Sequence, residues 1–318
     1  MSFSQPSRSD IICFGAGPAL LPTDVLEDAA KALINYDGAG LGIAEHAHRS
    51  QIAVNIINEA KANLAAYLDI PDDYEILFMQ GGGSGGSGRS QAAFWVGNHS
   101  GRALGTYLGT LLWCTTATTR GMFPNFPKCL ELEPDGPVVV ADMSSNIFSR
   151  KIPTRNFSAI SFEELSAAAF CSLDECETIA KNNSLYNTLR LFDVYIAGQV
   201  PKTLLLQYPD KIEGQQAVSE KAQIIYRAVD AHPEIYSIIP DKTVRSRMNI
   251  FFRMKSGDAA EEAFLKEGNA LGRIGLRGHR SLRGICASND NAVPFEGAQK
   301  LASIIEAFAS RSRTSAGE

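Results

Sequence analysis

The stretch Tyr74-Glu-Ile-Leu-Phe-Met-Gln-Gly-Gly-Gly-Ser-Gly85 decides the fold class, because an apolar segment runs directly into a glycine-rich one. The apolar residues of Tyr74–Met79 are typical of a short buried strand. A strand that leads into glycines is the arrangement that opens ligand sites in α/β sheets. Val138-Val-Val-Ala141 is a second apolar strand, and the polar segment Asp142-Met-Ser-Ser-Asn146 follows it. We therefore expect a mainly parallel sheet with its ligand at the carboxyl ends of the strands.

Helical periodicity flanks these strands. Apolar residues recur at helical spacing between residues 20 and 68, which predicts two amphipathic helices, and the pattern is again largely helical over 184–232. Beyond this point, an alternating strand at 247–253 is followed by helical segments at 259–272 and 293–309. We predict a large domain over residues 1–232 and a small C-terminal α/β domain over 233–318.

Two segments depart from this regularity. Residues 86–119 are rich in glycine and have little steady periodicity, so no packed element is predicted there. Residues 161–176 are the second such segment, because the resemblance of this chain to a known family implies strands here that the sequence lacks. The large domain is therefore predicted to be incomplete around both segments.

The composition excludes several classes of protein. With 318 residues, of which 45% are hydrophobic, the chain can bury a large core. The net charge is −5 and no run of Lys or Arg forms a basic stripe, so nucleic acid is not an expected partner. The first residues lack the pattern of a secretory or transit peptide, and no apolar run reaches membrane length, so a cytoplasmic protein without a membrane partner is expected.

Familiar catalytic signatures are also missing. The six cysteines do not follow a zinc-type spacing, so no metal site is expected. The sequence contains no serine-hydrolase elbow, Walker loop or dinucleotide-binding glycine fingerprint. The chemistry must therefore come from another kind of site.

The strand ends offer groups that could hold a phosphorylated ligand. Glycines at Gly81–Gly85 would let backbone N–H groups approach a phosphate closely, although a flexible loop is the simpler interpretation. Asp142 could pair with the ring nitrogen of a pyridoxal cofactor. Alternatively, Asp142 could cap a helix together with Ser144 and Ser145. The sequence by itself favours the cap.

Two His-Arg-Ser triplets are candidates for binding anions. One is His48-Arg49-Ser50, and the other lies in Gly278-His279-Arg280-Ser281. Arginine binds carboxylates and phosphates through two parallel hydrogen bonds, and a neighbouring histidine can add another donor. Isolated arginines are more often solvated surface groups, so the repetition of the triplet is what makes it suggestive.

Taken together, the motifs resemble those of phosphoserine aminotransferases in their order along the chain and in their residues. The likeness covers nearly all of residues 10–85 and 123–160 and most of 177–310. The segments that carry it are Phe14-Gly-Ala-Gly-Pro-Ala-Leu-Leu-Pro22, His48-Arg-Ser50, Phe78-Met-Gln-Gly-Gly-Gly-Ser-Gly85, Val138–Asn146, Asn183-Ser-Leu-Tyr-Asn-Thr188, Arg245-Ser-Arg-Met-Asn249 and Gly278-His-Arg-Ser281.

This resemblance implies a fold, a cofactor and a reaction. The fold would be the fold-type I, aspartate-aminotransferase-like α/β architecture, and the cofactor pyridoxal 5′-phosphate. The reaction would belong to serine biosynthesis: 3-phosphohydroxypyruvate and L-glutamate give O-phospho-L-serine and 2-oxoglutarate. A homodimer is implied as well, because residues of one subunit would complete the site of the other.

The resemblance also implies individual site residues. Gly83 and Ser84 would lie on the cofactor phosphate, and Asp142 on the pyridine nitrogen. Asn187 and Thr188 would reach the cofactor phosphate of the neighbouring subunit. Thr118 matches a cofactor-contacting threonine, although its neighbours differ from the family pattern. His48, Arg49, His279 and Arg280 would hold the anionic groups of the substrates.

Three departures from the family pattern bear on catalysis. The family's Schiff-base lysine position is occupied by Ser166, so no catalytic residue is assigned, and the nearby Lys151 and Lys181 belong to segments that match elsewhere. Cys286 stands where a substrate-binding arginine is expected. The segment whose tryptophan would stack on the cofactor ring has no counterpart.

Two explanations follow. The chain could be a family member whose coding sequence has lost or shifted segments, so that it is inactive in this form. Alternatively, it could be a non-catalytic relative that binds phosphate-bearing ligands or pairs with a complete subunit. The abrupt change between well-matched and unrelated segments favours the first.

Overall fold

The computed structural model describes residues 6–17, 19–80, 92–98, 110–114, 138–143, 146–157, 159–161, 173–278 and 283–314. The chain divides into two compact units, one of them built mainly from residues 21–212 and the other from the N-terminal residues to Leu20 together with residues from Glu213 onward. Helix α5 (Ile212–Asp230) thus belongs almost entirely to the second unit. The sequence predicted a domain boundary after residue 232, which would place this helix in the large domain. That boundary stays a prediction.

The large unit contains a five-stranded sheet in the order β2-β3-β6-β5-β4. Its strands are β2 (Tyr74–Gln80), β3 (Ala92–Asn98), β4 (Thr110–Cys114), β5 (Val138–Asp142) and β6 (Ala159–Ser161). Strands β2, β6, β5 and β4 share one direction, and β3 runs against them. The expected mainly parallel sheet is therefore confirmed.

Two of these strands lie in a segment for which no packed element was predicted. Within residues 86–119, β3 pairs with β2 along its whole length, and β4 pairs with β5. The sequence did not assign these strands because the glycines around Ala92–Asn98 hide the pattern of β3, whereas its partner strand supplies the backbone hydrogen bonds that stabilise it. In the other irregular segment, β6 ends at Ser161 and helix α3 begins at Leu173.

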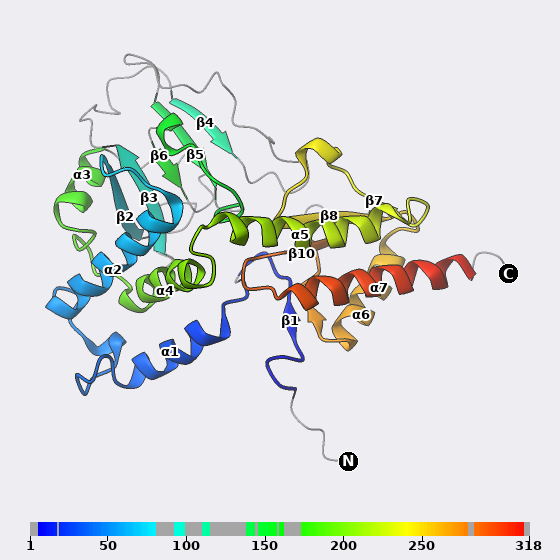
Figure 1. Ribbon diagram of the computed structural model, residues 1–318, viewed down its shortest axis with the longest axis horizontal. Coiled ribbons are helices and arrows are strands. Elements are labelled where there is room, and N and C mark those ends of the chain that lie inside the picture. Colours follow the sequence, from blue (N-terminus) through cyan, green and yellow to red (C-terminus); the bar gives the residue numbers. More distant parts are fainter. Residues whose placement is uncertain are drawn as a thin grey trace. The chain divides into compact units, whose positions relative to one another are not determined.

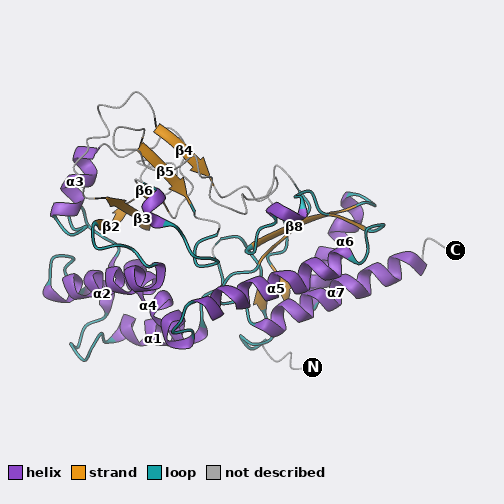
Figure 2. Cartoon of the chain, turned by 45° about the horizontal axis from the view of Figure 1, so that its top comes forward, coloured by secondary structure: helices purple, strands orange, loops and turns teal. Residues whose placement is uncertain are grey.

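The helices of the large unit are α1 (Thr23–Ile34), α2 (Gln51–Leu68), α3 (Leu173–Lys181) and α4 (Leu191–Gln207), with short 3-10 turns at Ile43–Glu45 and Thr154–Asn156. Helices α2 and α4 lie side by side in both Figure 1 and Figure 2. Their approach is very close, because a Cβ atom on Gly198 would lie only 2.7 Å from the Cα of Ala60. The buried apolar faces of both helices belong to one core with Tyr74, Ile76 and Phe78 of β2.

The second unit has a three-stranded antiparallel sheet in the order β10-β8-β7. Its elements are β1 (Ile12–Cys13), α5, β7 (Tyr236–Ser237), the 3-10 turn Lys242–Val244, β8 (Asn249–Met254), α6 (Asp258–Ala270), β9 (Arg273–Ile274), β10 (Ile285–Ser288) and α7 (Phe295–Thr314). The predicted strand at 247–253 and helices at 259–272 and 293–309 are thus present with small shifts at their ends.

The core of this unit is aromatic and aliphatic. Tyr236, Phe252, Phe264 and Phe308 contact one another in series through edge-to-face pairs with centroids 5.4–6.0 Å apart. Helices α5 and α7 both add buried residues to the same core. The N-terminal strand β1 completes the unit by pairing in parallel with β9. Within the described ranges, no helix is both long and apolar enough to cross a membrane.

Candidate functional site

The carboxyl ends of the parallel strands form one row across the large unit's sheet. Cys114 of β4 is in register with Asp142 of β5, and Asp142 with Ser161 of β6. Each of these is the last residue of its strand. Asp142, predicted to bind the ring nitrogen of the cofactor, therefore lies at the edge of the sheet where α/β proteins bind their ligands.

The other predicted cofactor residues follow the ends of these strands in the sequence. Gly83 and Ser84 follow the end of β2, Thr118 follows β4, and Ser166 follows β6. All four lie outside the described residues, so their roles stay predictions. Each of these segments nevertheless begins at the carboxyl end of a strand, and the three strands belong to one sheet. A shared ligand site requires this arrangement.

Hydrogen bonds hold the start of the segment Asn183–Thr188 against strand β2 and helix α2. Ser184 is buried, and its Oγ accepts a hydrogen bond of 2.9 Å from the backbone N–H of Phe78 in the edge strand β2. The Nδ2 of Asn183 donates to Oδ1 of Asn58 on α2 at 2.9 Å. Asn183 and Ser184 both have positive φ, 48° and 64°, which ends α3 sharply and turns the chain. The first half of this motif is therefore structural.

The second half of the motif faces solvent. Asn187 and Thr188 are both exposed on the large unit. This is the placement that contact with a neighbouring subunit requires, and that contact stays a prediction. The sequence motif therefore combines an anchor, Ser184, with two candidate binding residues, Asn187 and Thr188.

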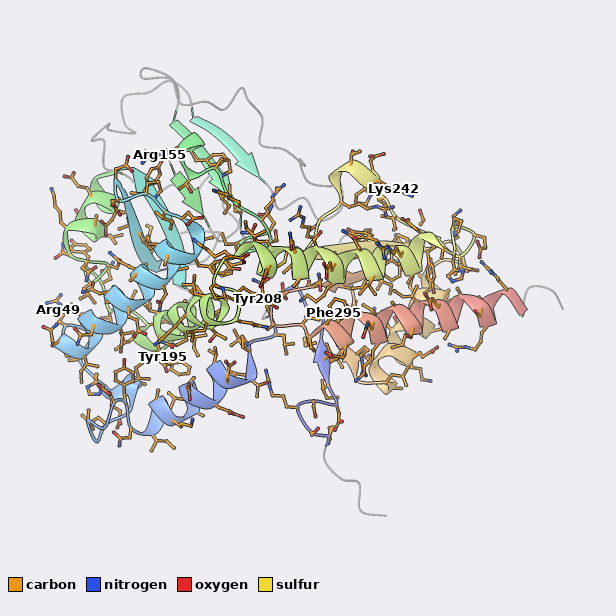
Figure 3. The ribbon with its side chains drawn as sticks, in the orientation of Figure 1. Arg49, Arg155, Tyr195, Tyr208, Lys242 and Phe295 are labelled. Atoms are coloured by element: carbon orange, nitrogen blue, oxygen red, sulfur yellow. The ribbon has the colours of Figure 1, made fainter. Side chains whose placement is uncertain are left out.

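His48 and Arg49 lie at the start of α2. Ser50 is the N-cap of that helix, and its Oγ accepts a hydrogen bond from Ala53 N at 3.2 Å. His48 is half-buried and Arg49 is exposed. Figure 3 shows Arg49 at the N-terminal end of α2, away from β4 and β5. The structure thus does not bring Arg49 to the strand ends of its own chain.

The loop that contains His279 and Arg280 is described only at its two ends. The N–H of Gly278 donates to the carbonyl of Gly284 at 2.9 Å, and that of Cys286 donates to the carbonyl of Leu276 at 2.8 Å. These bonds close a hairpin in the second unit. His279 and Arg280 themselves lie outside the described residues.

Cys286 occupies a buried position in β10. Its neighbours Ile285, Ala287 and Ser288 are buried as well. Burial raises the pKa of the Cys286 thiol to about 11, although Ser288 opposes this shift through a hydrogen bond. An uncharged thiol cannot replace the guanidinium that the family pattern places here.

Among the described residues, the lysines near the sheet do not suit a covalently bound pyridoxal cofactor. None of strands β2 to β6 contains a lysine. Lys151 is exposed, and Lys181 is paired with Glu177 on the surface of α3 at 2.6 Å. Within the described part of the chain, no lysine therefore lies on the sheet that presents Asp142.

One lysine with an unusual environment was missed by sequence reasoning. Lys221 of α5 is buried, and its Nζ donates to the carbonyls of Asp290 and Val293 at 2.8 and 2.7 Å. Burial lowers its pKa to about 8. Both contacts fix the loop after β10 in the second unit, so Lys221 is a structural residue rather than a substitute for the missing amine.

Comparisons with known proteins agree with the fold. The model of the class-V aminotransferase family matches residues 11–88. The phosphoserine aminotransferase of Saccharomyces cerevisiae is 32% identical over 387 aligned residues, which cover 94% of this chain and 97% of the relative. That of Drosophila melanogaster is 31% identical and covers 94% and 98% of the two chains. The structure of the Bacillus circulans subsp. alkalophilus enzyme has a TM-score of 0.77 at 27% identity and covers 94% and 98%.

The alignment with the yeast relative also shows how many positions this chain lacks. It spans 387 positions for the yeast relative, whereas this chain has 318 residues, so at least 69 positions have no counterpart here. This finding agrees with the internal deletions inferred from the sequence. The fold is that of the fold-type I aminotransferases, and the chain belongs to the phosphoserine aminotransferase family of pyridoxal-phosphate-dependent class-V aminotransferases.

Proposed function

We propose that this chain retains the anion-binding scaffold of its family without the covalent chemistry of transamination. The family reaction converts 3-phosphohydroxypyruvate and glutamate into phosphoserine and 2-oxoglutarate. In this proposal, the chain binds the phosphate-bearing ligands, pyridoxal phosphate among them, but does not turn over the substrates. The observation that carries the proposal is the absence of lysine from strands β2 to β6, together with Ser166 at the family's lysine position.

The missing amine is decisive because two functions depend on it. A lysine at this site attaches the cofactor, and it also moves the proton between substrate and product carbon atoms. The serine hydroxyl at 166 can do neither, since it forms no Schiff base and is a very weak base at neutral pH. The lysines 151 and 181 lie on the surface and do not offer a replacement.

Substrate recognition is also altered. The buried thiol of Cys286 carries no positive charge at neutral pH, whereas the family pattern has an arginine at this position. Loss of a bidentate charged contact weakens carboxylate binding strongly. The proposed ligands are therefore those recognised chiefly through phosphate, by way of Gly83, Ser84, Thr118, Asn187 and Thr188 for the cofactor and His48, Arg49, His279 and Arg280 for the substrate.

A homodimer is part of the proposal. Asn187 and Thr188 are exposed on the single chain, and Arg49 lies at the end of α2 away from β4 and β5. Both observations favour a site that a second copy completes. A chloroplastic relative from Arabidopsis thaliana is 29% identical, so the expected cytoplasmic location stays a prediction.

The test is an absorbance titration of the purified chain with pyridoxal phosphate, before and after borohydride, followed by peptide mapping. We expect saturable binding that dialysis reverses, and no single lysine modified in proportion to the bound cofactor. Glutamate-dependent formation of phosphoserine would overturn the proposal. Stoichiometric labelling of one lysine, such as Lys151 or Lys181, would do the same, because it would identify a substitute amine.

A further inference from the structure

The last turn of α7 is held to the second unit by side chains rather than by the core. Ala309 is the last described residue of α7 in the buried core, and none of residues 310–313 is buried. The hydroxyls of the two serines in this turn bond to carbonyls of α7 itself. Its two arginines, Arg311 and Arg313, contact other segments of the unit. These two side chains therefore attach the helix end.

Arg313 contacts the turn that joins α5 to β7. Its Nε donates to Oε1 of Glu234 at 2.6 Å, and its Nη2 lies 2.9 Å from Nδ1 of His232. The backbone fixes this turn, because the carbonyl of His232 accepts from the N–H groups of Ile235 and Tyr236 at 3.0 Å. The side chain of His232 is only 13% exposed. Arg313, Glu234 and His232 thus form a defined cluster, which we call the latch.

The latch depends on the protonation state of His232. A guanidinium group has N–H donors and no acceptor, so the contact of Arg313 with Nδ1 at 2.9 Å requires a lone pair on that nitrogen. The hydrogen-bond geometry therefore assigns the proton of the neutral ring to Nε2. A proton added to Nδ1 turns this nitrogen into a donor, and two positively charged groups then face each other. Protonation of the ring and its contact with Arg313 thus exclude one another.

The other groups around His232 favour an exchange of partners. Oε1 of Glu234 lies 3.8 Å from Nδ1, close enough to pair with a protonated ring. Hydrogen bonds from its own backbone and from Arg313 lower the pKa of the Glu234 carboxyl, so it is ionised when the ring takes up a proton. Tyr236 of β7 contacts the ring with centroids 6.4 Å apart and stays uncharged, because burial raises its pKa. The protonated ring therefore competes with Arg313 for Glu234.

We propose that the latch is a pH-sensitive switch, in which protonation of His232 releases the last turn of α7. Histidine is the side chain whose charge ordinarily changes between pH 5 and 8, so the release occurs at mildly acidic pH. The neighbouring pair of Arg311 with Glu267 contains no histidine and stays formed over this range. The release is confined to the helix end, because the buried residues up to Ala309 do not take part. The switch is independent of the proposed function, since it involves none of the predicted binding residues.

The test is hydrogen exchange of the peptide that covers residues 306–314, measured in the full chain by mass spectrometry at pH 5.0 and at pH 7.5. The rates are corrected for the intrinsic effect of pH, so that they report opening of the helix end. We expect opening to be about fivefold more frequent at pH 5.0, as the loss of one hydrogen bond to a charged group implies. His232→Gln should show no such difference, because its amide oxygen accepts from Arg313 at both pH values. Equal opening of the unsubstituted chain at the two pH values would overturn the proposal.

Two further variants separate the switch from a general weakening of the helix end. Arg313→Gln removes the latch, so the helix end should open as often at pH 7.5 as it does at pH 5.0 in the unsubstituted chain. Arg313 is 51% exposed, so this variant keeps the test decisive even where His232→Gln does not fold.

Arg311→Gln is the matched control on the same turn. It breaks the neighbouring pair with Glu267 and should leave the pH dependence of opening unchanged. Circular dichroism establishes that each variant is folded. A pH dependence that persists in His232→Gln or in Arg313→Gln would show that another group senses the proton, and the role of His232 would be overturned.

Discussion

The hydroxyl of Ser184 accepts a hydrogen bond from the backbone N–H of Phe78, 106 residues earlier in the chain, at 2.9 Å. Phe78 lies in the edge strand β2, two residues before the strand ends at Gln80. Ser184 begins the turn that leads to Asn187 and Thr188. One buried bond therefore ties β2, the strand that precedes Gly83 and Ser84 in the sequence, to the segment that contains Asn187 and Thr188.

Replacing Ser184 by Ala should destabilise the large unit. The N–H of Phe78 would lose its acceptor in a buried place, and a buried donor left without a partner costs about 1–3 kcal/mol. Urea unfolding followed by circular dichroism measures the loss. The control is Ser303→Ala on α7, whose exposed hydroxyl bonds only to a carbonyl of its own helix. Equal unfolding midpoints for the two variants would contradict the role assigned to Ser184.

The contact between α2 and α4 gives a second prediction. Gly198→Ala would place a methyl group 2.7 Å from both Cα and Cβ of Ala60. Alanine favours a helix over glycine by about 1 kcal/mol, but overpacking a tight contact costs about 1–3 kcal/mol. The net change should therefore be destabilising, measured as a lower thermal midpoint. Gly17→Ala, where no atom lies within 4 Å of the added Cβ, is the matched control and should change little.

The reactivity of Cys286 provides a third prediction. Burial raises the pKa of its thiol to about 11, so only a small fraction is thiolate at pH 8. Cys13 is partly exposed. With iodoacetamide at pH 8, Cys286 should be alkylated much more slowly than Cys13, as measured by peptide mass spectrometry over time. Guanidine hydrochloride should remove the difference, and equal rates in the native protein would show that Cys286 is accessible.

The sequence predicted the parts of this fold that local patterns determine. The helix over Gln51–Leu68 and the strand over Tyr74–Gln80 follow from the periodicity of their apolar residues. Strand β3 was missed because its stability comes from pairing with β2 and β6 rather than from its own composition. Such long-range pairing leaves little trace in the segment itself.

In the candidate site, too, local sequence patterns predicted some residues, whereas residues that act through long-range contacts were not predicted. Ser184 and Lys221 were not identified as anchors because each acts on a backbone group brought close only by folding. A serine in a motif and a lysine in a helix are ordinary surface residues by pattern. Asp142, in contrast, was placed at the mouth of a strand from its sequence context, and the structure puts it at the end of β5.

The buried Lys221 and the half-buried Asp290 together predict an unusual dependence of stability on pH. Burial raises the pKa of Asp290 from 3.8 to about 6, although Lys221 opposes the shift. Burial lowers the pKa of Lys221 from 10.5 to about 8, against the attraction of Asp290. Each group is therefore harder to charge in the folded chain than in the unfolded chain.

The signs follow from counting protons. Between pH 3.8 and 6, Asp290 holds its proton more in the folded chain, so its contribution to the unfolding free energy falls as pH rises. Between pH 8 and 10.5, Lys221 is protonated mainly in the unfolded chain, so its contribution rises with pH. A shift of about two pKa units for Asp290, or between two and three for Lys221, corresponds to about 3 kcal/mol for either group.

Replacing Asp290 by Asn should remove the acidic part of this dependence. The Asn side chain never has to be ionised, so the unfolding free energy measured in urea should fall less between pH 4.5 and 6.5 than in the unsubstituted chain. At pH 6.5 the variant should be the more stable of the two, because it avoids burying a charge. Asp72→Asn, at an exposed position of the large unit, is the control and should reproduce the unsubstituted profile. A profile for Asp290→Asn that parallels the control would show that Asp290 ionises in the folded chain as easily as in water.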